Sequence, residues 1–308
     1  MMMLAAETCP LDETLGRYLA RDITAAGNFP PFARSCVDGF AVRAADTASA
    51  SAANPVRLTL AGSVPMGAPP ERPLGPGEAM AITTGGMMPV AADTVAMAEA
   101  STAVGGFLTL IQRLTPGENM MAAGAYASAG DRLLPAGKRL DAAALGMLAA
   151  AGILQIEVFA PIQVGIISTG DELVDAASRP AAGQIRDSNS LVLGALVRQS
   201  GARPLRLGIC PDDAATLKAM LRAAMRRARL VIVSGGSAAG PKDVTALVIR
   251  ELAAGARVIG LPGPTARAIE VYRTAVDPLI ADIYRRGKVR ESEILNDGHP
   301  KKESSHKR

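Results

Sequence analysis

The chain has 308 residues, 49% hydrophobic and 20% charged, which excludes a disordered protein and leaves room for two or more packed units. Aromatic residues make up 3% and Trp is absent, so the core must be mainly aliphatic. Much of the net charge of +4 lies after Tyr284, and no basic stripe is interleaved with aromatic residues, so we expect no nucleic-acid partner.

The first segment, residues 1–43, is predicted to hold a helix and an exposed loop. Leu11, Leu15, Leu19 and Ile23 recur at spacings of four, which predicts an amphipathic helix over 11–26. Two prolines follow at positions 30 and 31 and hold the backbone extended. We expect the next residues, 34–39, to form an exposed Asp-Gly loop.

Residues 44–160 are predicted to form a small inserted β domain and a linker helix. Short alternating runs at 56–60, 80–83 and 107–111 are separated by Gly and Pro clusters, which indicates a β domain over 44–128. A linker over 129–160 contains an Ala-rich segment, 141–152, that predicts a helix ended by Gly152. We expect this helix to pack against the first one.

Residues 161–285 alternate between strands and helices and predict an α/β domain. The expected strands are 164–167, 204–208, 230–233 and 258–261, and the expected helices are 189–200, 212–228, 243–254 and 265–285. This pattern is typical of an open, mostly parallel sheet flanked by helices, which binds ligands where its strands end. The functional loops are then 168–172, 184–190, 234–243 and 262–266. A disordered charged tail is expected over 286–308.

The rare reactive residues exclude several kinds of site. The three cysteines are far apart, at positions 9, 36 and 210, so neither a disulfide framework nor a cysteine metal site is expected, and a cytoplasmic location fits best. Both histidines, His299 and His306, lie in the tail, which excludes histidine-based catalysis in the body. The N-terminus does not resemble a signal peptide, and the apolar run 142–154 is too short to span a bilayer, so we expect no membrane partner.

The loops of the α/β domain carry the candidate chemistry. The loop 168–172 presents two hydroxyls and two carboxylates, although Thr-Gly-Asp also forms ordinary turns. The loop 234–240 is rich in glycine and precedes a helix, so its backbone could approach a phosphate, although a tight turn needs the same glycines. Five nearby carboxylates could hold Mg²⁺ with substrate phosphates: Asp171, Glu172, Asp187, Asp212 and Asp243.

Several ordered motifs make the chain resemble the molybdopterin molybdenumtransferase family, which includes MoeA and the E domain of gephyrin. Residues 30–42, PPFARSCVDGFAV, are similar to its P-x-F-x-x-S-x-x-D-G-[YF]-A-V signature. Residues 168–173, 183–189, 234–236 and 260–263 resemble its pterin-binding motifs, in the same order. Thr84 and Gly85, with Asp93 and Glu99, resemble a further stretch of its β domain. The similarity covers roughly residues 11–285.

The resemblance implies a function and a set of site residues. The family hydrolyses adenylylated molybdopterin and inserts molybdate, and Asp38 and Thr84 would be catalytic, in a cleft between the β domain of one subunit and the α/β domain of its dimer partner. The metal Mg²⁺ would bind Asp171 and Asp243. The pterin and its phosphate would contact Ser168, Thr169, Gly170, Asp171, Glu172, Asp187, Ser188, Asn189, Ser234, Gly235, Gly236, Pro262 and Gly263. A homodimer and contact with the adenylylating protein of the pathway are also expected.

Four departures from the family pattern bear on activity. No Lys-Pro-Gly-Lys-Pro turn lies between Gly255 and the strand at 258–261, and residues 119–126 replace an Arg-rich run. Ala238 stands where Ser is usual, and Pro264-Thr265 where Asn-Pro is usual. The body ends near 285, so we expect the family's C-terminal β-barrel domain to be missing.

Three functions stay open on the sequence. The first is a working molybdenumtransferase, favoured by Asp38, Thr84 and the retained carboxylates. The second is a non-catalytic paralogue that binds molybdopterin or a nucleotide, or pairs with a full-length family member, favoured by the missing lysines and domain. The third, a nucleotide-dependent enzyme with another substrate, depends on the glycine-rich loop alone.

Overall fold

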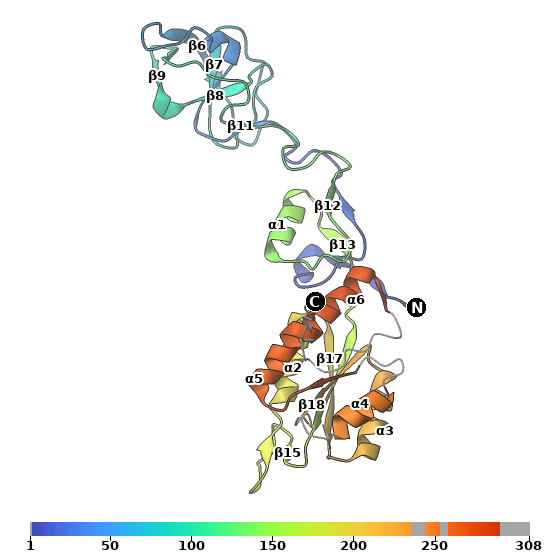
Figure 1. Cartoon of the computed structure of the whole chain (residues 1–308). Helices are drawn as coiled ribbons and strands as arrows, with labels where there is room; N and C mark the ends of the chain where they lie inside the picture. Colours follow the sequence, from blue (N-terminus) through green and yellow to red (C-terminus); the bar gives the residue numbers. More distant parts are fainter. Residues whose placement is uncertain (1, 236–243, 253–257, 290–308) are drawn as a thin grey trace, which may run out of the picture. The chain divides into compact units, whose positions relative to one another are not determined.

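The computed structural model describes residues 2–235, 244–252 and 258–289. Contacts divide the chain into two compact units, which are described separately. The α/β unit comprises Met1–Asp22 and Pro135–Arg308, and the β unit comprises Ile23–Leu134 (Figure 1). In the described part of the chain, no helix is both long and apolar enough to cross a membrane.

The α/β unit is built on a four-stranded sheet whose strands all run parallel, in the order β17-β14-β18-β19. The strands are Gln163–Thr169 (β14), Arg203–Cys210 (β17), Leu230–Ser234 (β18) and Val258–Leu261 (β19). In β18, Leu230 and Ile232 pack into one hydrophobic cluster, and Val231 and Val233 pack into another. Both faces of the sheet are therefore buried, which is why the strand reads as a continuous apolar run. The predicted α/β fold is confirmed, and the predicted parallel arrangement is confirmed for these four strands.

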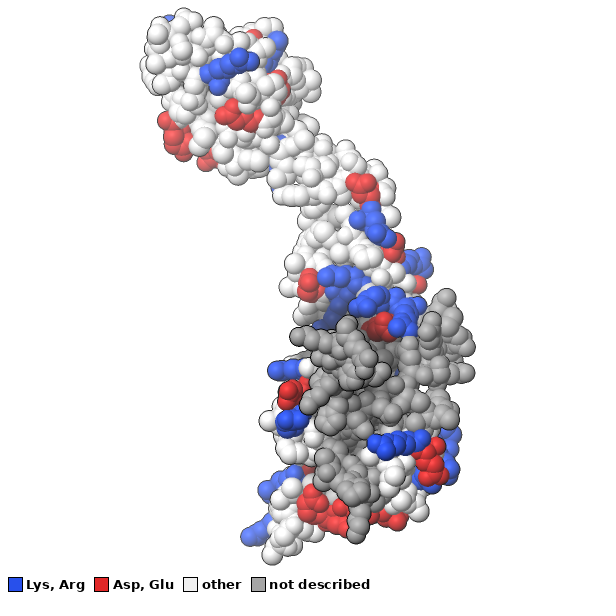
Figure 2. Space-filling model, viewed as in Figure 1, with Lys and Arg blue, Asp and Glu red and all other residues white. Residues whose placement is uncertain are grey.

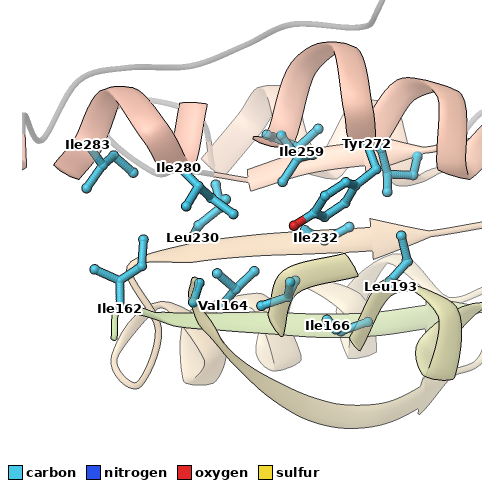
Figure 3. Packing of buried hydrophobic residues seen from close by; sticks show 14 of the residues in the cluster. Ile162, Val164, Ile166, Leu193, Leu230, Ile232, Ile259, Tyr272, Ile280 and Ile283 are labelled. Carbon is cyan, nitrogen blue, oxygen red and sulfur yellow. The ribbon is translucent and has the colours of Figure 1, made fainter. Parts of the chain in front are cut away.

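Helices cover the two faces of this sheet as separate layers (Figure 1). One layer contains α2, α5, η4 and α6, and the other contains α3 and α4. The helices are Asn189–Gln199 (α2), Ala214–Met225 (α3), Val244–Leu252 (α4), Thr265–Val271 (α5), Tyr272–Val276 (η4, a π-helical turn) and Asp277–Arg286 (α6). Figure 3 shows Tyr272, Ile280 and Ile283 pointing from the first layer toward the strands. The helix predicted over 265–285 thus consists of two α-helical segments joined by a π-helical turn.

The N-terminal segment lacks the helix predicted over 11–26. It forms β2 (Ala6–Pro10), a 3-10 turn η1 (Leu11–Glu13) and then extended backbone in which Leu19 bridges Val158. Gly16 takes a φ of +78°, which ends any helical path at that point. The helix prediction from the leucine spacing was wrong. The leucines do not share one buried face, since Leu19 is fully buried whereas Leu15 is 63% exposed.

The linker helix is present but has a different partner from the one expected. Helix α1 spans Ala142–Ala150, its N-cap Asp141 accepts a hydrogen bond from Ala144 N at 2.8 Å, and Gly152 follows with a φ of +76°. It packs against η1, since no first helix exists. After α1, β13 (Gln155–Phe159) pairs antiparallel with β2.

The β unit contains a six-stranded mixed sheet in the order β8-β5-β7-β6-β10-β9. The strands are Gly39–Val42 (β5), Val56–Ser63 (β6), Glu78–Ile82 (β7), Thr94–Met97 (β8), Ser101–Val104 (β9) and Phe107–Leu110 (β10). Neighbouring residues of β5 pack on opposite sides, Ala41 with Met80 and Ile82, and Val42 with Leu58. The runs predicted at 56–60, 80–83 and 107–111 are strands.

Short elements complete both units. The 3-10 turns of the β unit are Ala44–Thr47 (η2) and Ala98–Ala100 (η3). Four pairs of short strands are β1 (Met2–Met3) with β20 (Lys288–Val289), β3 (Ile23–Thr24) with β12 (Arg132–Leu134), β4 (Arg34–Ser35) with β11 (Met120–Met121), and β15 (Leu173–Val174) with β16 (Ile185–Arg186). The last pair extends the loop that follows β14.

Candidate functional site

The carboxyl ends of β14, β18 and β19 surround a pocket of about 450 Å³, called here the strand-end pocket. Most of the residues predicted to bind a pterin line it: Ser168, Thr169, Glu172, Asp187, Ser188, Asn189, Ser234, Gly235 and Gly263. Gly170, Asp171 and Pro262 belong to the same loops but do not line the pocket. Gly236 and Asp243 lie outside the described residues. Parallel strands bring these loops together because their carboxyl ends meet at one edge of the sheet.

Five further residues line the pocket without having been predicted by name: Leu173, Ile185, Arg186, Pro264 and Thr265. Their loops were predicted, but their side-chain directions depend on the β15–β16 pair and on the start of α5. Arg186 brings a positive charge to the wall, and its Nε donates to the Ser178 carbonyl oxygen at 3.1 Å.

Asn189 joins three of the loops at the edge of this pocket. Its Nδ2 donates to Ser234 Oγ at 2.9 Å and to the Gly263 carbonyl oxygen at 2.7 Å. Its Oδ1 accepts from Thr265 Oγ1 at 2.7 Å. One side chain at the start of α2 therefore fixes the ends of β18 and β19 relative to α2.

Ser168 and Thr169 offer polar atoms that the described part of the protein leaves without a partner. Their side chains are 0% and 4% exposed, and neither Ser168 Oγ nor Thr169 Oγ1 has a hydrogen-bond partner there. A buried hydroxyl without a partner costs about 1–3 kcal/mol, so such groups usually bond to an ordered water, an ion or a ligand. Both residues line the strand-end pocket, where a ligand could satisfy them.

Two glycines shape the backbone beside these hydroxyls. Gly170 has a φ of +147° and Gly235 a φ of +99°, conformations that side-chain-bearing residues rarely adopt. A Cβ on Gly235 would also collide with the carbonyl oxygen of Thr169. Glycine at 235 therefore lets the loops after β14 and β18 approach each other, and Gly235 N donates to the Leu261 carbonyl oxygen at 3.1 Å.

Carboxylates gather near the same strand ends. Asp212 N donates to Asp171 Oδ1 at 3.1 Å, and the pKa of Asp212 is raised by burial and then by the charges of Asp171 and Glu172. Asp187 is 5% exposed and its Oδ1 accepts from Ser190 N at 3.0 Å, at the positive end of α2. Figure 2 shows acidic side chains, in red, gathered at one end of the α/β unit.

The described residues do not form a complete metal site by themselves. No group of three or more His, Cys, Asp or Glu side chains among them is placed to hold an ion. Of the predicted metal ligands, Asp171 is described and Asp243 is not. Mg²⁺ commonly takes only one or two protein carboxylates, together with substrate phosphates.

The β unit brings together the two residues predicted to be catalytic. Asp38 Oδ1 accepts from Thr84 N at 2.7 Å and from Thr84 Oγ1 at 2.9 Å. Asp38 is exposed, and these bonds, the backbone bond first, lower the pKa of its carboxyl. The neighbouring backbone is also fixed, because Ala98 N donates to the Asp38 carbonyl oxygen at 3.1 Å. The result is an exposed carboxylate that stays ionised at neutral pH.

The residues that replace the family's Arg-rich run lie beside this loop. Met120 and Met121 form β11, which pairs with Arg34 and Ser35 of β4. Arg34 Nη2 lies 3.7 Å from Met121 Sδ, and Cys36 N donates to the Asn119 carbonyl oxygen at 2.9 Å. Arg34 therefore places a cation on the strand adjacent to the methionines.

Two family models match the chain over most of its length. The model described as the MoeA N-terminal region (domain I and II) matches residues 1–152. The model described as a probable molybdopterin binding domain matches residues 165–256, the segment that contains most of the strand-end pocket.

Individual proteins show the same relationship. A molybdopterin molybdenumtransferase of Nostoc sp. is 34% identical over 289 residues, covering 86% of this chain and 66% of the Nostoc protein. The Haemophilus influenzae molybdopterin molybdenumtransferase is 31% identical, with 89% and 72% of the two chains covered. A crystal structure of a molybdopterin biosynthesis MoeA protein from Pyrococcus horikoshii matches with a TM-score of 0.67 and 35% identity, over 93% of this chain and 77% of that one. The chain thus spans just under two thirds of the length of its Nostoc relative.

Proposed function

The chain belongs to the molybdopterin molybdenumtransferase (MoeA) family, and on this premise we propose that it binds adenylylated molybdopterin in the strand-end pocket and acts as a molybdenumtransferase in molybdenum cofactor biosynthesis. The observation that carries the proposal is the pair of buried hydroxyls, Ser168 Oγ and Thr169 Oγ1, which line the pocket and have no partner among the described residues. A pterin is rich in ring nitrogens and exchangeable hydrogens, so it would supply the missing hydrogen bonds.

The phosphate part of the substrate would bind where backbone N–H groups and an arginine side chain attract negative charge. Helix α2 begins at Asn189, so its positive end faces the strand-end pocket. Gly235 allows close approach of the backbone, and Arg186 adds a guanidinium group to the wall. These groups are proposed to offset the carboxylates of Glu172 and Asp187 in the same pocket.

Mg²⁺ is proposed to accompany the phosphates, with Asp171 and Asp243 as its protein ligands. When bound, the ion would neutralise phosphate charge during cleavage of the phosphoanhydride bond. Because the described carboxylates form no complete metal site, we expect appreciable Mg²⁺ binding only when the phosphorylated substrate is present.

Asp38 and Thr84 are proposed to serve the reaction from the β unit. Thr84 holds the Asp38 carboxylate in one orientation and keeps it ionised. An ionised, exposed carboxylate can accept a proton from attacking water or orient it. A homodimer, contact with the adenylylating protein of the pathway and a cytoplasmic location are parts of the same proposal. Light scattering and co-purification would test the first two.

The test is an assay of adenylylated molybdopterin with Mg²⁺ and molybdate, in which release of adenosine monophosphate and metal insertion are measured separately. We expect the wild type to perform both reactions and Asp38→Ala to lose both while still binding the pterin. Thr102→Ala, at an exposed position of the same unit, is the control and should behave as wild type.

Failure of both reactions in the wild type would overturn the enzyme proposal. Retained pterin binding in that case would instead support a non-catalytic binding protein. No geometric feature of the described residues favours that alternative, because the strand-end pocket and the Asp38–Thr84 pair are both present.

A further inference from the structure

A second pocket of the α/β unit, of about 520 Å³, shares no lining residue with the strand-end pocket. Three arginines line it, so it is called here the arginine pocket: Arg139, Arg198 and Arg273. They come from three separate segments, namely the chain before α1, the last turn of α2 and the π-helical turn η4. The folded chain, rather than a local run of basic residues, therefore brings these charges together.

These arginines are poorly neutralised within the described part of the protein. Arg139 Nε donates to the Gly16 carbonyl oxygen at 3.3 Å, and this uncharged acceptor does not neutralise the guanidinium group. The guanidinium groups of Arg198 and Arg273 form neither a hydrogen bond nor an ion pair with any described residue. Asp277 is the one acidic residue among the described residues that line the pocket. Three positive charges thus face one negative charge.

The carboxylate of Asp277 is already engaged by a buried hydroxyl chain. Ser200 Oγ donates to Asp277 Oδ1 at 2.5 Å and lies 2.8 Å from the Tyr272 hydroxyl. Ser200 and Tyr272 are 3% and 1% exposed, and Figure 3 shows the Tyr272 ring within the hydrophobic core. This polar wall is therefore part of the core packing, and it limits how Asp277 can move toward the arginines.

The π-helical turn is an independent indication of function at this place. Such turns are rare and occur frequently at functional sites, because the wider turn costs helical stability. Here the turn spans Tyr272–Val276 and places Tyr272 in the core and Arg273 on the arginine pocket. The next residue after the turn is Asp277, so Tyr272, Arg273 and Asp277 reach the pocket from one short stretch of chain.

We propose that the arginine pocket binds a small phosphorylated organic molecule. Guanidinium groups pair with phosphate oxygens through two parallel hydrogen bonds, and the phosphate dianion would balance the two arginines that have no partner in the described part of the chain. Leu15 and Leu196 also line the pocket and would contact the organic part of the ligand. The volume is within the range of small-molecule sites.

Calorimetric titration with inorganic phosphate and with ribose 5-phosphate, on the full chain at low ionic strength, tests this proposal. We expect both probes to bind, ribose 5-phosphate more tightly, and the double variant Arg198→Gln/Arg273→Gln to bind each at least tenfold more weakly. The matched control is Arg222→Gln, an exposed arginine of α3 outside the pocket, with an expected change of less than twofold.

Absence of binding at millimolar probe, or an equal effect of the double variant and the control, would overturn the proposal. Binding of molybdopterin should be the same in all these variants. Molybdopterin binding and phosphate binding are therefore independent results. Either pocket can lack its proposed ligand while the other binds its own.

Discussion

Thr84 donates two hydrogen bonds to a single carboxylate oxygen of Asp38, from its backbone N at 2.7 Å and from its Oγ1 at 2.9 Å. The two residues are 46 positions apart, and the β unit brings them together because Asp38 lies just before β5 and Thr84 lies just after β7. The pair holds an exposed carboxylate in its ionised form and in one direction.

Removing the Thr84 hydroxyl should raise the pKa of Asp38 only part of the way to the ordinary value of 3.8. In Thr84→Val the backbone donor remains, and it is the larger cause of the lowered pKa. Carboxyl-detected NMR titration should place the pKa of Asp38 between its wild-type value and the ordinary 3.8. Thr102→Val is the control, and an unchanged pKa in Thr84→Val would contradict the assigned hydrogen bond.

The same pair has a defined pH dependence. Because the pKa of Asp38 is lower in the folded than in the unfolded chain, its contribution to stability is present above 3.8 and is lost as the pH falls through the folded pKa. Thr84→Val should therefore lose less stability on acidification than the wild type. Denaturant unfolding at pH 6 and at pH 3 measures this difference.

A side chain at position 235 should destabilise the protein more than a side chain at another glycine of positive φ. Gly235→Ala and Gly183→Ala both incur the roughly 1–2 kcal/mol of a left-handed backbone. A Cβ meets the Thr169 carbonyl at 235 and nothing within 4 Å at 183. We expect Gly235→Ala to be destabilised by about 1–3 kcal/mol more and to lose pterin binding. Equal behaviour of the two variants in thermal unfolding and binding would argue against the close approach.

Asn189 should affect the strand-end pocket by positioning its loops. In Asn189→Asp an oxygen replaces the amide that donates to the Gly263 carbonyl, so attraction becomes repulsion. We expect pterin binding at least about tenfold weaker and a lower melting temperature. Thr265→Val removes only one bond of the same network and should weaken binding by about threefold or less. A larger effect in Thr265→Val would point to direct ligand contact by Thr265 instead.

Tyr284 should be a stability residue of the α/β unit. Its hydroxyl accepts from Ile162 N at 2.8 Å and donates to the Gly201 carbonyl oxygen at 3.1 Å, so Tyr284→Phe leaves two backbone groups unpaired. We expect a loss of about 1–3 kcal/mol, against no measurable loss for Tyr126→Phe, which is 60% exposed.

Burial also raises the pKa of Tyr284 to about 12, so its contribution is present below the ordinary 10 and is lost as the pH rises toward 12. The free energy of unfolding of Tyr284→Phe should therefore fall less steeply over that range than that of the wild type.

The α/β fold could be predicted because its physical signal is local. Each strand is buried on both faces and reads as a short apolar run, as in β18, and each helix follows at a regular interval. The N-terminal segment could not be predicted in this way. Its backbone pairs with residues more than a hundred positions away, as Leu19 does with Val158, and this pairing overrides the helical spacing of the leucines.

Part of the candidate site could likewise be predicted from the sequence, and part could not. The convergence of the loops after β14, β18 and β19 could be predicted from the parallel sheet. The directions of the Arg186 and Thr265 side chains could not, because they are set by turns, which leave no periodic pattern in the sequence. The Asp38–Thr84 pair had no local signal and came from the family resemblance alone. The role of Asp243 stays a prediction, since this residue lies outside the described part of the chain.

Ser168→Ala shows whether the unpartnered Ser168 hydroxyl binds the pterin, as proposed. Equilibrium binding of adenylylated molybdopterin and thermal unfolding should be measured on the wild type, on Ser168→Ala and on Ser178→Ala, an exposed control outside the pocket. Removing a buried hydroxyl that has no partner in the described structure should leave the melting temperature unchanged or raise it, while binding weakens by roughly three- to tenfold. Binding in Ser168→Ala equal to that of the control, or no saturable binding by the wild type, would contradict pterin binding by this hydroxyl.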